Sequence, residues 1–203
     1  MTEQDLKTEE KILEAAMTVF IQKGKAAARM QEIADTAGIN KALLHYYYRS
    51  KDKLYESVFS IVIKQLLLPK IFKILQEEED VFALIHQFAD FYVGVINKNP
   101  FIPLFVIEEI NKNPNRLSNA VLNSGIPIEQ VIARFQKAMD EGKIRKTDPR
   151  QILVNLISMC IFPVAARNML LPILFNNSKT EYKKFLELRK TEVAEFIIQS
   201  IKI

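Results

Sequence analysis

Cationic side chains are concentrated in one short stretch of this 203-residue chain. From Lys23 to Lys53, seven cationic and three acidic residues leave a net charge of +4, which equals the formal net charge of the whole sequence. Such a cluster attracts phosphates, so it predicts nucleic-acid binding, and a solvated surface is the alternative. The residues counted are Lys23, Lys25, Arg29, Lys41, Arg49, Lys51 and Lys53 against Glu32, Asp35 and Asp52.

No set of side chains with catalytic or metal-binding spacing accompanies this charge. The sequence has no glycine-rich phosphate loop, no nucleophile elbow and no recognisable pair of carboxylates. Its two histidines, His45 and His86, have no acidic or thiol cluster around them. Cys160 is the only cysteine, which excludes an internal disulfide and suits a reducing cytoplasm. We therefore expect no enzymatic activity, no metal and no cofactor, and a cytoplasmic protein.

The cations lie on a predicted pair of short helices. Residues 30–37 have an inward apolar stripe, and Gly38 ends this helix because glycine adopts left-handed backbone without a Cβ clash. Asn40 is a predicted N-cap for a second helix over residues 41–48. In that helix we expect Leu44 and Tyr48 to face the core and Lys41, Ala42, His45 and Tyr46 to face outward. Two helices joined by a glycine-containing turn are typical of a helix-turn-helix, whose second helix can lie in the DNA major groove.

Residues 32–59, EIADTAGINKALLHYYYRSKDKLYESVF, resemble the DNA-binding signature of the tetracycline-repressor (TetR) family of bacterial regulators. That signature runs roughly (D/E)-I-A-x-x-A-G-V-S-x-x-T-(L/I)-Y-x-Y-F-x-(S/N)-K-E-x-L. The resemblance covers about the first quarter of the chain, and its many fixed spacings make it specific. The residues that match in register are Glu32, Ile33, Ala34, Ala37, Gly38, Ile39, Leu44, Tyr47, Tyr48, Ser50, Lys51 and Leu54.

The sequence departs from the family pattern at four positions. Leu43 stands where the family often has Thr or Ser, and His45 where Tyr is common. Ala28 and Arg29 replace a Thr/Ser pair that usually caps the first helix of the motif, and neither can cap it as a hydroxyl would. These departures concern the operator sequence rather than the docking mode.

The resemblance implies how the motif would dock on DNA. The start of the helix near Met30 faces phosphate and groove, so Arg29 and Gln31 are expected contacts there. Tyr47 is expected to contact phosphate, with a plain core aromatic as the alternative, and Lys51 adds charge at a phosphate-facing helix start. Lysine and histidine can donate to guanine, and small apolar groups can meet thymine methyls. The candidates for base edges are Lys41, Ala42, Leu43, His45 and Tyr46.

The remaining sequence predicts an all-α protein of about nine helices. We expect a three-helix DNA-binding domain over residues 1–50 and, by the resemblance, a helical ligand-binding and dimerisation domain over residues 51–203. Helix signals predict a first helix between Thr8 and Gly24 and a fourth from Lys51 to about Leu68, which Pro69 bends or ends. A turn is expected at residues 113–115 and a helix from Ile126 to Glu141. A long helix over residues 149–175, kinked at Pro163, and a last one over residues 179–201 follow.

The apolar run Leu156 to Phe175 approaches the length of a membrane span. Arg167 and Asn168 near its middle would be costly in lipid, so we expect a buried helix and no membrane partner. The first ten residues are polar and acidic and do not predict a signal peptide.

Relatives in the TetR family are homodimers through their last two long helices, here about 149–175 and 179–201, and enclose a ligand cavity. Dimerisation would set two recognition helices roughly 34 Å apart, as a palindromic operator requires. A largely apolar ligand is expected, although an ordinary core is the alternative. Arg167 is expected to pair with Glu108 or Glu109, to reach an interface, or to meet an anionic ligand. The candidate ligand-binding residues are His86, Phe88, Tyr92, Phe105, Met159, Phe162, Arg167 and Asn168. Phe101, Asn155 and Met169 are further aromatic, polar or methionine side chains in the same part of the sequence.

Together these features indicate a one-component, ligand-responsive repressor that binds a palindromic operator on double-stranded DNA through residues 41–48. A protein-interaction module that has lost operator binding is the alternative, which the changes at Ala28, Arg29 and His45 slightly favour. An enzyme using the carboxy-terminal cavity would need a reactive group that the sequence lacks.

Overall fold

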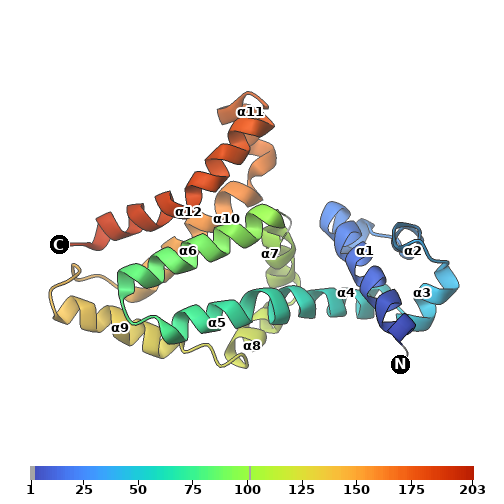
Figure 1. The fold of residues 1–203 in the computed structure, drawn as a ribbon, viewed down its shortest axis with the longest axis horizontal. Helices are drawn as coiled ribbons and strands as arrows, with labels where there is room; N and C mark the ends of the chain where they lie inside the picture. Colours follow the sequence, from blue (N-terminus) through green and yellow to red (C-terminus); the bar gives the residue numbers. More distant parts are fainter. Residues whose placement is uncertain (1–2, 101) are drawn as a thin grey trace. The chain divides into compact units, whose positions relative to one another are not determined.

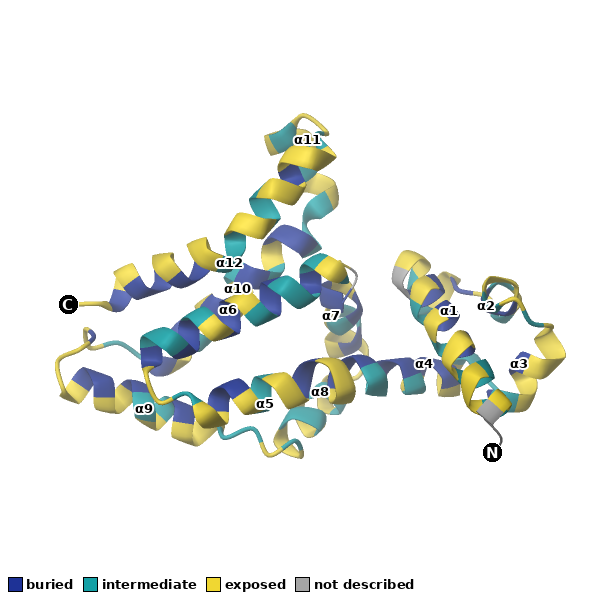
Figure 2. Ribbon diagram, in the orientation of Figure 1, coloured by how far each residue is buried: buried dark blue, intermediate teal, exposed yellow. Residues whose placement is uncertain are grey.

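The computed structural model describes residues 3–100 and 102–203, and within them the backbone is helical with no named strand (Figure 1). The all-α prediction is therefore confirmed, although twelve α-helices and one π-helix are described where about nine helices were predicted. The chain divides into two compact units, one reaching to Leu67 and one comprising Leu68–Ile203. Each unit has its own buried core (Figure 2). Phe101 lies outside the described residues.

The first unit contains five helical segments. They are α1 (Glu3–Ala27), α2 (Met30–Ala37), α3 (Lys41–Tyr47), α4 (Lys51–Ser60) and the π-helix η1 (Ile61–Leu67). Helix α1 begins before the predicted Thr8, whose hydroxyl donates to the Gln4 carbonyl instead of capping the helix. Gly24 has φ 72°, so the helical geometry is interrupted where the sequence predicts an end.

Helix α4 belongs to the first unit because it shares that unit's core. Tyr55 is buried and its ring meets the Phe20 ring of α1 edge to face, with centroids 5.2 Å apart. Ile12 of α1, Ile33 of α2 and Leu44 of α3 are fully buried in the same unit. The predicted domains divide the chain after Ser50, whereas the compact units divide after Leu67, since α1 needs the apolar face of α4 as well as that of α2.

The second unit is built around one long apolar helix. Its elements are α5 (Leu68–Glu77), α6 (Val81–Lys98), α7 (Ile102–Lys112), α8 (Pro114–Leu122), α9 (Ile128–Asp140), α10 (Pro149–Ala165), α11 (Arg167–Phe175) and α12 (Lys179–Ile201). Helix α6 packs along α12 and against α10 and α5 (Figure 1). The buried residues of α6 recur at spacings of three and four, which gives it a continuous core face.

Three predicted boundaries differ from the structure around proline. Pro69 is the second residue of α5, and the predicted α-helix from Lys51 to about Leu68 is π-helical over Ile61–Leu67. Pro114 begins α8 where a turn is predicted, because the first helical position needs no backbone N–H. The predicted helix from Ile126 begins at Ile128, directly after Pro127.

The predicted long helix over residues 149–175 is wrong, since the chain leaves helical geometry at Ala166 and bends by 76° between α10 and α11. Pro163 remains inside α10. Because proline has no N–H, the carbonyl of Met159 is free of its usual helical partner and accepts from Arg189 Nη2 at 2.7 Å. The Pro163 carbonyl in turn accepts from the Tyr182 hydroxyl at 2.6 Å. Helix α12 therefore satisfies backbone groups of α10 near the bend.

The expectation that this apolar run is buried is also wrong for a single chain. Helix α10 buries one face only, and α11 has no buried residue. Among the described helices, none alone is long and apolar enough to cross a membrane. Helices α10 and α11 have that length and composition only together, and the pair is bent by 76°. The exposed large apolar side chains of this run are Ile157, Phe162, Met169, Ile173 and Leu174, preceded by Val154.

Candidate nucleic-acid interface

The turn between α2 and α3 has the geometry that its residue types predict. Gly38 ends α2 with φ 67° and its N–H donates to the carbonyl of Asp35. The side-chain oxygen of Asn40 accepts from the Leu43 N–H at 2.7 Å, which satisfies a free donor of the first turn of α3. Leu44 is fully buried and anchors α3 to the core. The predicted glycine end and asparagine cap are confirmed.

The outward face of α3 carries free hydrogen-bonding groups. Lys41, Ala42, Leu43, His45 and Tyr46 are exposed, and the exposed fraction of Tyr46 is 79%. None of the polar side chains in this set makes a hydrogen bond or ion pair with other described residues. The structure therefore brings these five candidates together on one face of a short, anchored helix. Free donors beside small apolar groups can contact base edges in a major groove.

The two tyrosines at the end of α3 are held by the first helix. The Tyr47 hydroxyl donates to Oδ1 of Asp5 at 3.1 Å, and the Tyr48 hydroxyl donates to Oε1 of Glu9 at 2.8 Å. Partial burial and the neighbouring carboxylates raise the pKa of both phenols above 10.0. Tyr48 is buried as predicted, while Tyr47 is half-buried with its hydroxyl near the surface. No short-range pattern in the sequence indicates these acids as partners.

The candidate residues at the start of α2 and α4 differ in how free they are. Arg29 precedes α2, is exposed and makes no cap bond, as its side chain predicts. Gln31 is exposed but its amide nitrogen donates to Oδ1 of Asp35 at 2.8 Å. Lys51 is half-buried, and its ammonium donates to the carbonyls of Ala26 and Ala28 at 3.2 and 3.1 Å. Lys51 thus closes the end of α1, a structural role that the sequence does not reveal.

Internal pairing reduces the cationic cluster to fewer free charges. Lys23 pairs with Glu32, and Lys25 pairs with Asp52 at 3.1 Å while lying over the Tyr55 ring. Within the stretch from Lys23 to Lys53, four exposed cations have no acidic partner among the described residues, namely Arg29, Lys41, Arg49 and Lys53. Arg49 and Lys53 were counted in the net charge but not singled out as contacts. Their lack of partners, which only the structure reveals, makes them candidates for phosphate contacts.

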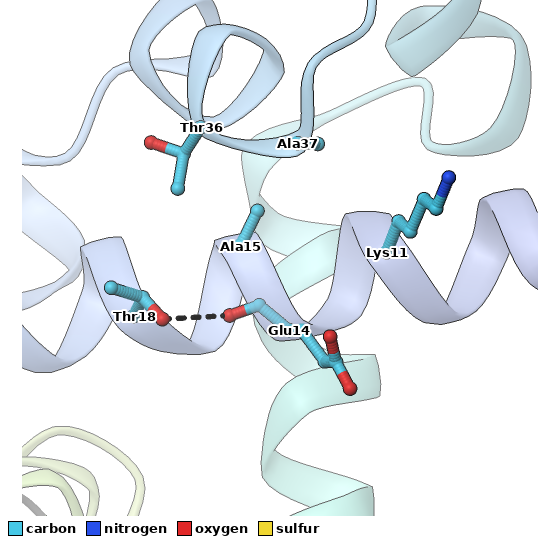
Figure 3. A pocket seen from close by; sticks show the side chains of 6 residues that line it. All are labelled: Lys11, Glu14, Ala15, Thr18, Thr36 and Ala37. Carbon is cyan, nitrogen blue, oxygen red and sulfur yellow. Dashed lines mark hydrogen bonds between the residues drawn. The ribbon is translucent and has the colours of Figure 1, made fainter.

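A polar crevice of about 250 Å³ lies between α1 and α2, and its lining residues come from these two helices (Figure 3). The Thr18 hydroxyl donates to the Glu14 carbonyl at 3.0 Å, and the Thr36 hydroxyl donates to the Glu32 carbonyl. Its hydroxyl donors are therefore used within their own helices. In the described part of the chain, no group of three histidine, cysteine or acidic side chains is placed to hold a metal ion.

The candidate ligand-binding residues of the second unit do not converge. Phe88 and Tyr92 are buried residues of α6, and their rings stack face to face with centroids 5.5 Å apart. Burial raises the pKa of Tyr92 to about 12. His86 lies on another side of α6, where its Nε2 is 3.3 Å from Glu195. Phe105 is buried, whereas Phe162 and Asn168 are exposed. Met159 lines one cavity and Arg167 lines another.

The predicted acid partner of Arg167 is wrong. Glu108 pairs with Lys112 one turn away on α7. Glu109 is only 1% exposed and lies 3.0 Å from Arg116. Arg167 instead lies over the ring of Tyr182, with 5.9 Å from guanidinium carbon to ring centroid. The two acids are therefore occupied within α7 and α8, which leaves an interface or an anionic ligand for Arg167.

Comparison with known proteins shows what this geometry is similar to. Residues 12–58 match the family model of the bacterial regulatory proteins of the tetR family. The transcriptional regulator RutR of Escherichia coli K12 is 27% identical over 143 residues, which span 70% of this chain and 66% of RutR. IcaR of Staphylococcus aureus strain Newman, a negative regulator of a biofilm operon, is 25% identical over 73% of this chain and 77% of IcaR.

Solved structures agree with the fold over nearly the whole chain. The hemolysin II transcriptional regulator HlyIIR has a TM-score of 0.64 at 24% identity and covers 97% of this chain and 98% of its own. The ketosteroid regulator KstR2 of Mycobacterium tuberculosis has a TM-score of 0.73 at 14% identity, over 97% and 95% of the two chains. The class defined is a helix-turn-helix regulator with a separate helical unit. Residues 12–58 thus resemble the DNA-binding part of tetR-family regulators, and the described chain has the fold of solved regulators of this kind.

Proposed function

We propose that this protein is a transcriptional repressor whose α3 reads the DNA major groove. The observation that carries the proposal is the outward face of α3. There Lys41, His45 and Tyr46 are exposed and make no hydrogen bond or ion pair with described residues, while Leu44 and the Asn40 cap hold the helix in place. Lysine and histidine donors fit guanine acceptors, and the methyl groups of Ala42 and Leu43 fit thymine. Repression is supported by IcaR, which is a negative regulator.

The proposed phosphate contacts flank this helix. Arg29 before α2, and Arg49 and Lys53 around the start of α4, are exposed cations without acidic partners in the described residues. Gln31 and Tyr47 are proposed as further contacts whose present hydrogen-bond partners, Asp35 and Asp5, must yield or share. Lys51 contributes by its charge, since its ammonium is bound to carbonyls of α1.

We also propose that two copies associate through α10, α11 and α12 and bind a palindromic operator. The support is the apolar surface that one chain leaves in contact with water, because a contiguous exposed apolar patch marks an interaction site. A two-fold pair would present two recognition helices to one duplex face, roughly 34 Å apart. The exposed side chains concerned are Val154, Ile157, Phe162, Met169, Ile173, Leu174, Leu188 and Phe196.

The second unit is then the ligand-responsive part. A ligand changes operator affinity only if it prefers one conformer of the dimer, so its effect on DNA binding equals its differential affinity for the two conformers. The proposal therefore divides the work as the compact units do: DNA contact in the amino-terminal unit, dimerisation and ligand binding in the carboxy-terminal unit.

Selection of bound fragments from the source genome tests this function. We expect recovered fragments to share an inverted repeat. Affinity for them should fall steeply with salt while remaining above that for random DNA of equal length. Sedimentation of the free protein at micromolar concentration should give twice the monomer mass of 23.4 kDa. If the protein binds DNA without sequence preference, or does not bind DNA even at low salt, the protein-interaction module is the function that remains.

A further inference from the structure

A second concave site lies in the carboxy-terminal unit, where the ends of four helices meet. The cavity has a volume of about 270 Å³. Its walls come from the end of α6 and the residue Pro100, the end of α10, the first residue of α11 and the first nine residues of α12. The lining residues are Asn97, Pro100, Val164, Arg167, Lys179, Tyr182, Lys183, Leu186 and Glu187.

The charge of this cavity is positive and unneutralised. Arg167, Lys179 and Lys183 contribute three cations, and none of them has an acidic partner among the described residues. The single acid in the lining, Glu187, lies 3.1 Å from Lys190. Arg167 is fixed over the Tyr182 ring, and a guanidinium held by an aromatic face keeps its planar fork of donors for a carboxylate.

Asn97 adds a group that needs a hydrogen-bond donor. Its amide nitrogen donates to the Leu186 carbonyl at 3.1 Å, which fixes the side chain. Its side-chain oxygen is buried and has no partner. A buried acceptor without a donor destabilises the fold by its lost hydration, so a ligand hydroxyl or amine that reaches it would recover that loss.

The rest of the lining is apolar, with Pro100, Val164 and Leu186 beside the ring of Tyr182. The hydroxyl of Tyr182 is already bound to the Pro163 carbonyl, so the ring offers the cavity mainly its carbon surface. A ligand made only of charge, such as inorganic phosphate, would leave these walls without contacts. The volume also limits the ligand to a small molecule.

We propose that this cavity binds a small monocarboxylate with an apolar body and one hydrogen-bond donor. Its carboxylate pairs with Arg167 and Lys183, its body lies against Leu186 and Tyr182, and its donor reaches Asn97. The proposal deepens the ligand response of the proposed function, because it names the class of ligand and the place where it binds. Ligand binding is measured without DNA, so the ligand site and the proposed DNA-binding function can fail separately.

The probe is 4-hydroxybenzoate, titrated calorimetrically into the full-length protein at pH 7.5 and 0.1 M NaCl. We expect one saturable site per chain with a Kd of about 1 mM or lower, as a ligand of this size allows. Two controls test the chemistry. The neutral 4-hydroxybenzamide should bind about ten-fold more weakly or not at all, and so should inorganic phosphate. Equal binding of either one would overturn the assignment of a carboxylate with an apolar body.

Matched variants locate the binding. Arg167→Gln and Lys183→Gln should each weaken binding about ten-fold, whereas Lys184→Gln, a neighbour on α12 that does not line the cavity, should leave it unchanged. Lys183 is exposed, so its variant reports on binding even if Arg167→Gln lowers stability. Unchanged affinity in Lys183→Gln, or absence of saturable binding in a protein that still binds DNA, overturns the site. Binding without a change in DNA affinity supports the site and contradicts the ligand response.

Discussion

The phenol of Tyr47 in the recognition helix donates a hydrogen bond to the carboxylate of Asp5 in the first turns of α1, 3.1 Å away. These residues are 42 positions apart in the chain. The contact places a negative charge beside the residue that the TetR resemblance assigns to phosphate. The acidic start of α1 therefore orients the end of α3, and its charge would oppose the approach of a phosphate there.

The variant Asp5→Asn should strengthen DNA binding. The asparagine amide keeps an acceptor for the Tyr47 phenol but removes the charge that repels phosphate, so we expect roughly two- to five-fold tighter binding near 0.1 M salt. Fluorescence anisotropy with a selected fragment measures the change. Glu10→Gln, an exposed acid on α1 without a contact to α3, is the matched control and should have a smaller effect. Equal effects of the two variants would mean that only overall charge matters.

The cap of the recognition helix should be measurable as stability. Asn40→Ala removes the acceptor of the Leu43 N–H and should lower the free energy of unfolding by about 1 kcal/mol. Asn40→Ser retains a capping oxygen and should recover most of that loss. Urea denaturation followed by circular dichroism compares the three proteins. If serine and alanine destabilise the protein equally, the side-chain cap has no role in holding α3.

Two lysines two positions apart should separate a structural role from a DNA-binding role. Lys51→Ala leaves the carbonyls of Ala26 and Ala28 without their donor, so it should lower the free energy of unfolding by about 1 kcal/mol as well as weaken DNA binding. Lys53→Ala removes an exposed, unpaired cation, so it should weaken binding to all sequences and leave stability within about 0.5 kcal/mol. A stable Lys51→Ala protein would contradict the structural role of that lysine.

The single cysteine should be unreactive in the folded protein. Burial raises the pKa of Cys160 from 9.0 to about 12, which lowers the thiolate fraction at pH 8 by about 1000-fold. Because the folded state favours the neutral thiol, the stability that Cys160 contributes is present below pH 9 and is lost as the pH rises towards 12. Labelling with a chromogenic disulfide reagent at pH 8 should be slow in the native protein and fast in urea. Native labelling at the rate of the unfolded chain would refute this burial.

Short-range signals were sufficient to predict the recognition motif. Gly38 requires a left-handed backbone, Asn40 can cap only its own helix, and Leu44 lies on the inward face by helical periodicity. Each of these features depends on residues within a few positions of one another, so local sequence is enough to predict the conformation of the motif. The exposed set around Lys41 and His45 follows from the same periodicity.

Long-range partners could not be predicted in the same way. Asp5 meets Tyr47, and Lys51 meets the end of α1, only because α1 and α3 fold together, and the sequence offers many equivalent acids and carbonyls. Glu109 pairs with Arg116 and not with Arg167, because Arg116 lies on α8. The sequence pattern at Pro114 predicts a turn there, so it does not indicate this helix. The sharp bend at Ala166 has no glycine or proline at its position, so the nearby Pro163 was a misleading signal.

The most direct test is the affinity of wild type, Lys41→Ala and Lys53→Ala for every single-base variant of one selected operator half-site. We expect Lys41→Ala to lose about 1–3 kcal/mol of discrimination at one base pair and to retain it elsewhere. Lys53→Ala should weaken binding to all variants by the same factor. If Lys41→Ala keeps the wild-type preference at every position, or if the two variants behave alike, then α3 does not read the DNA sequence.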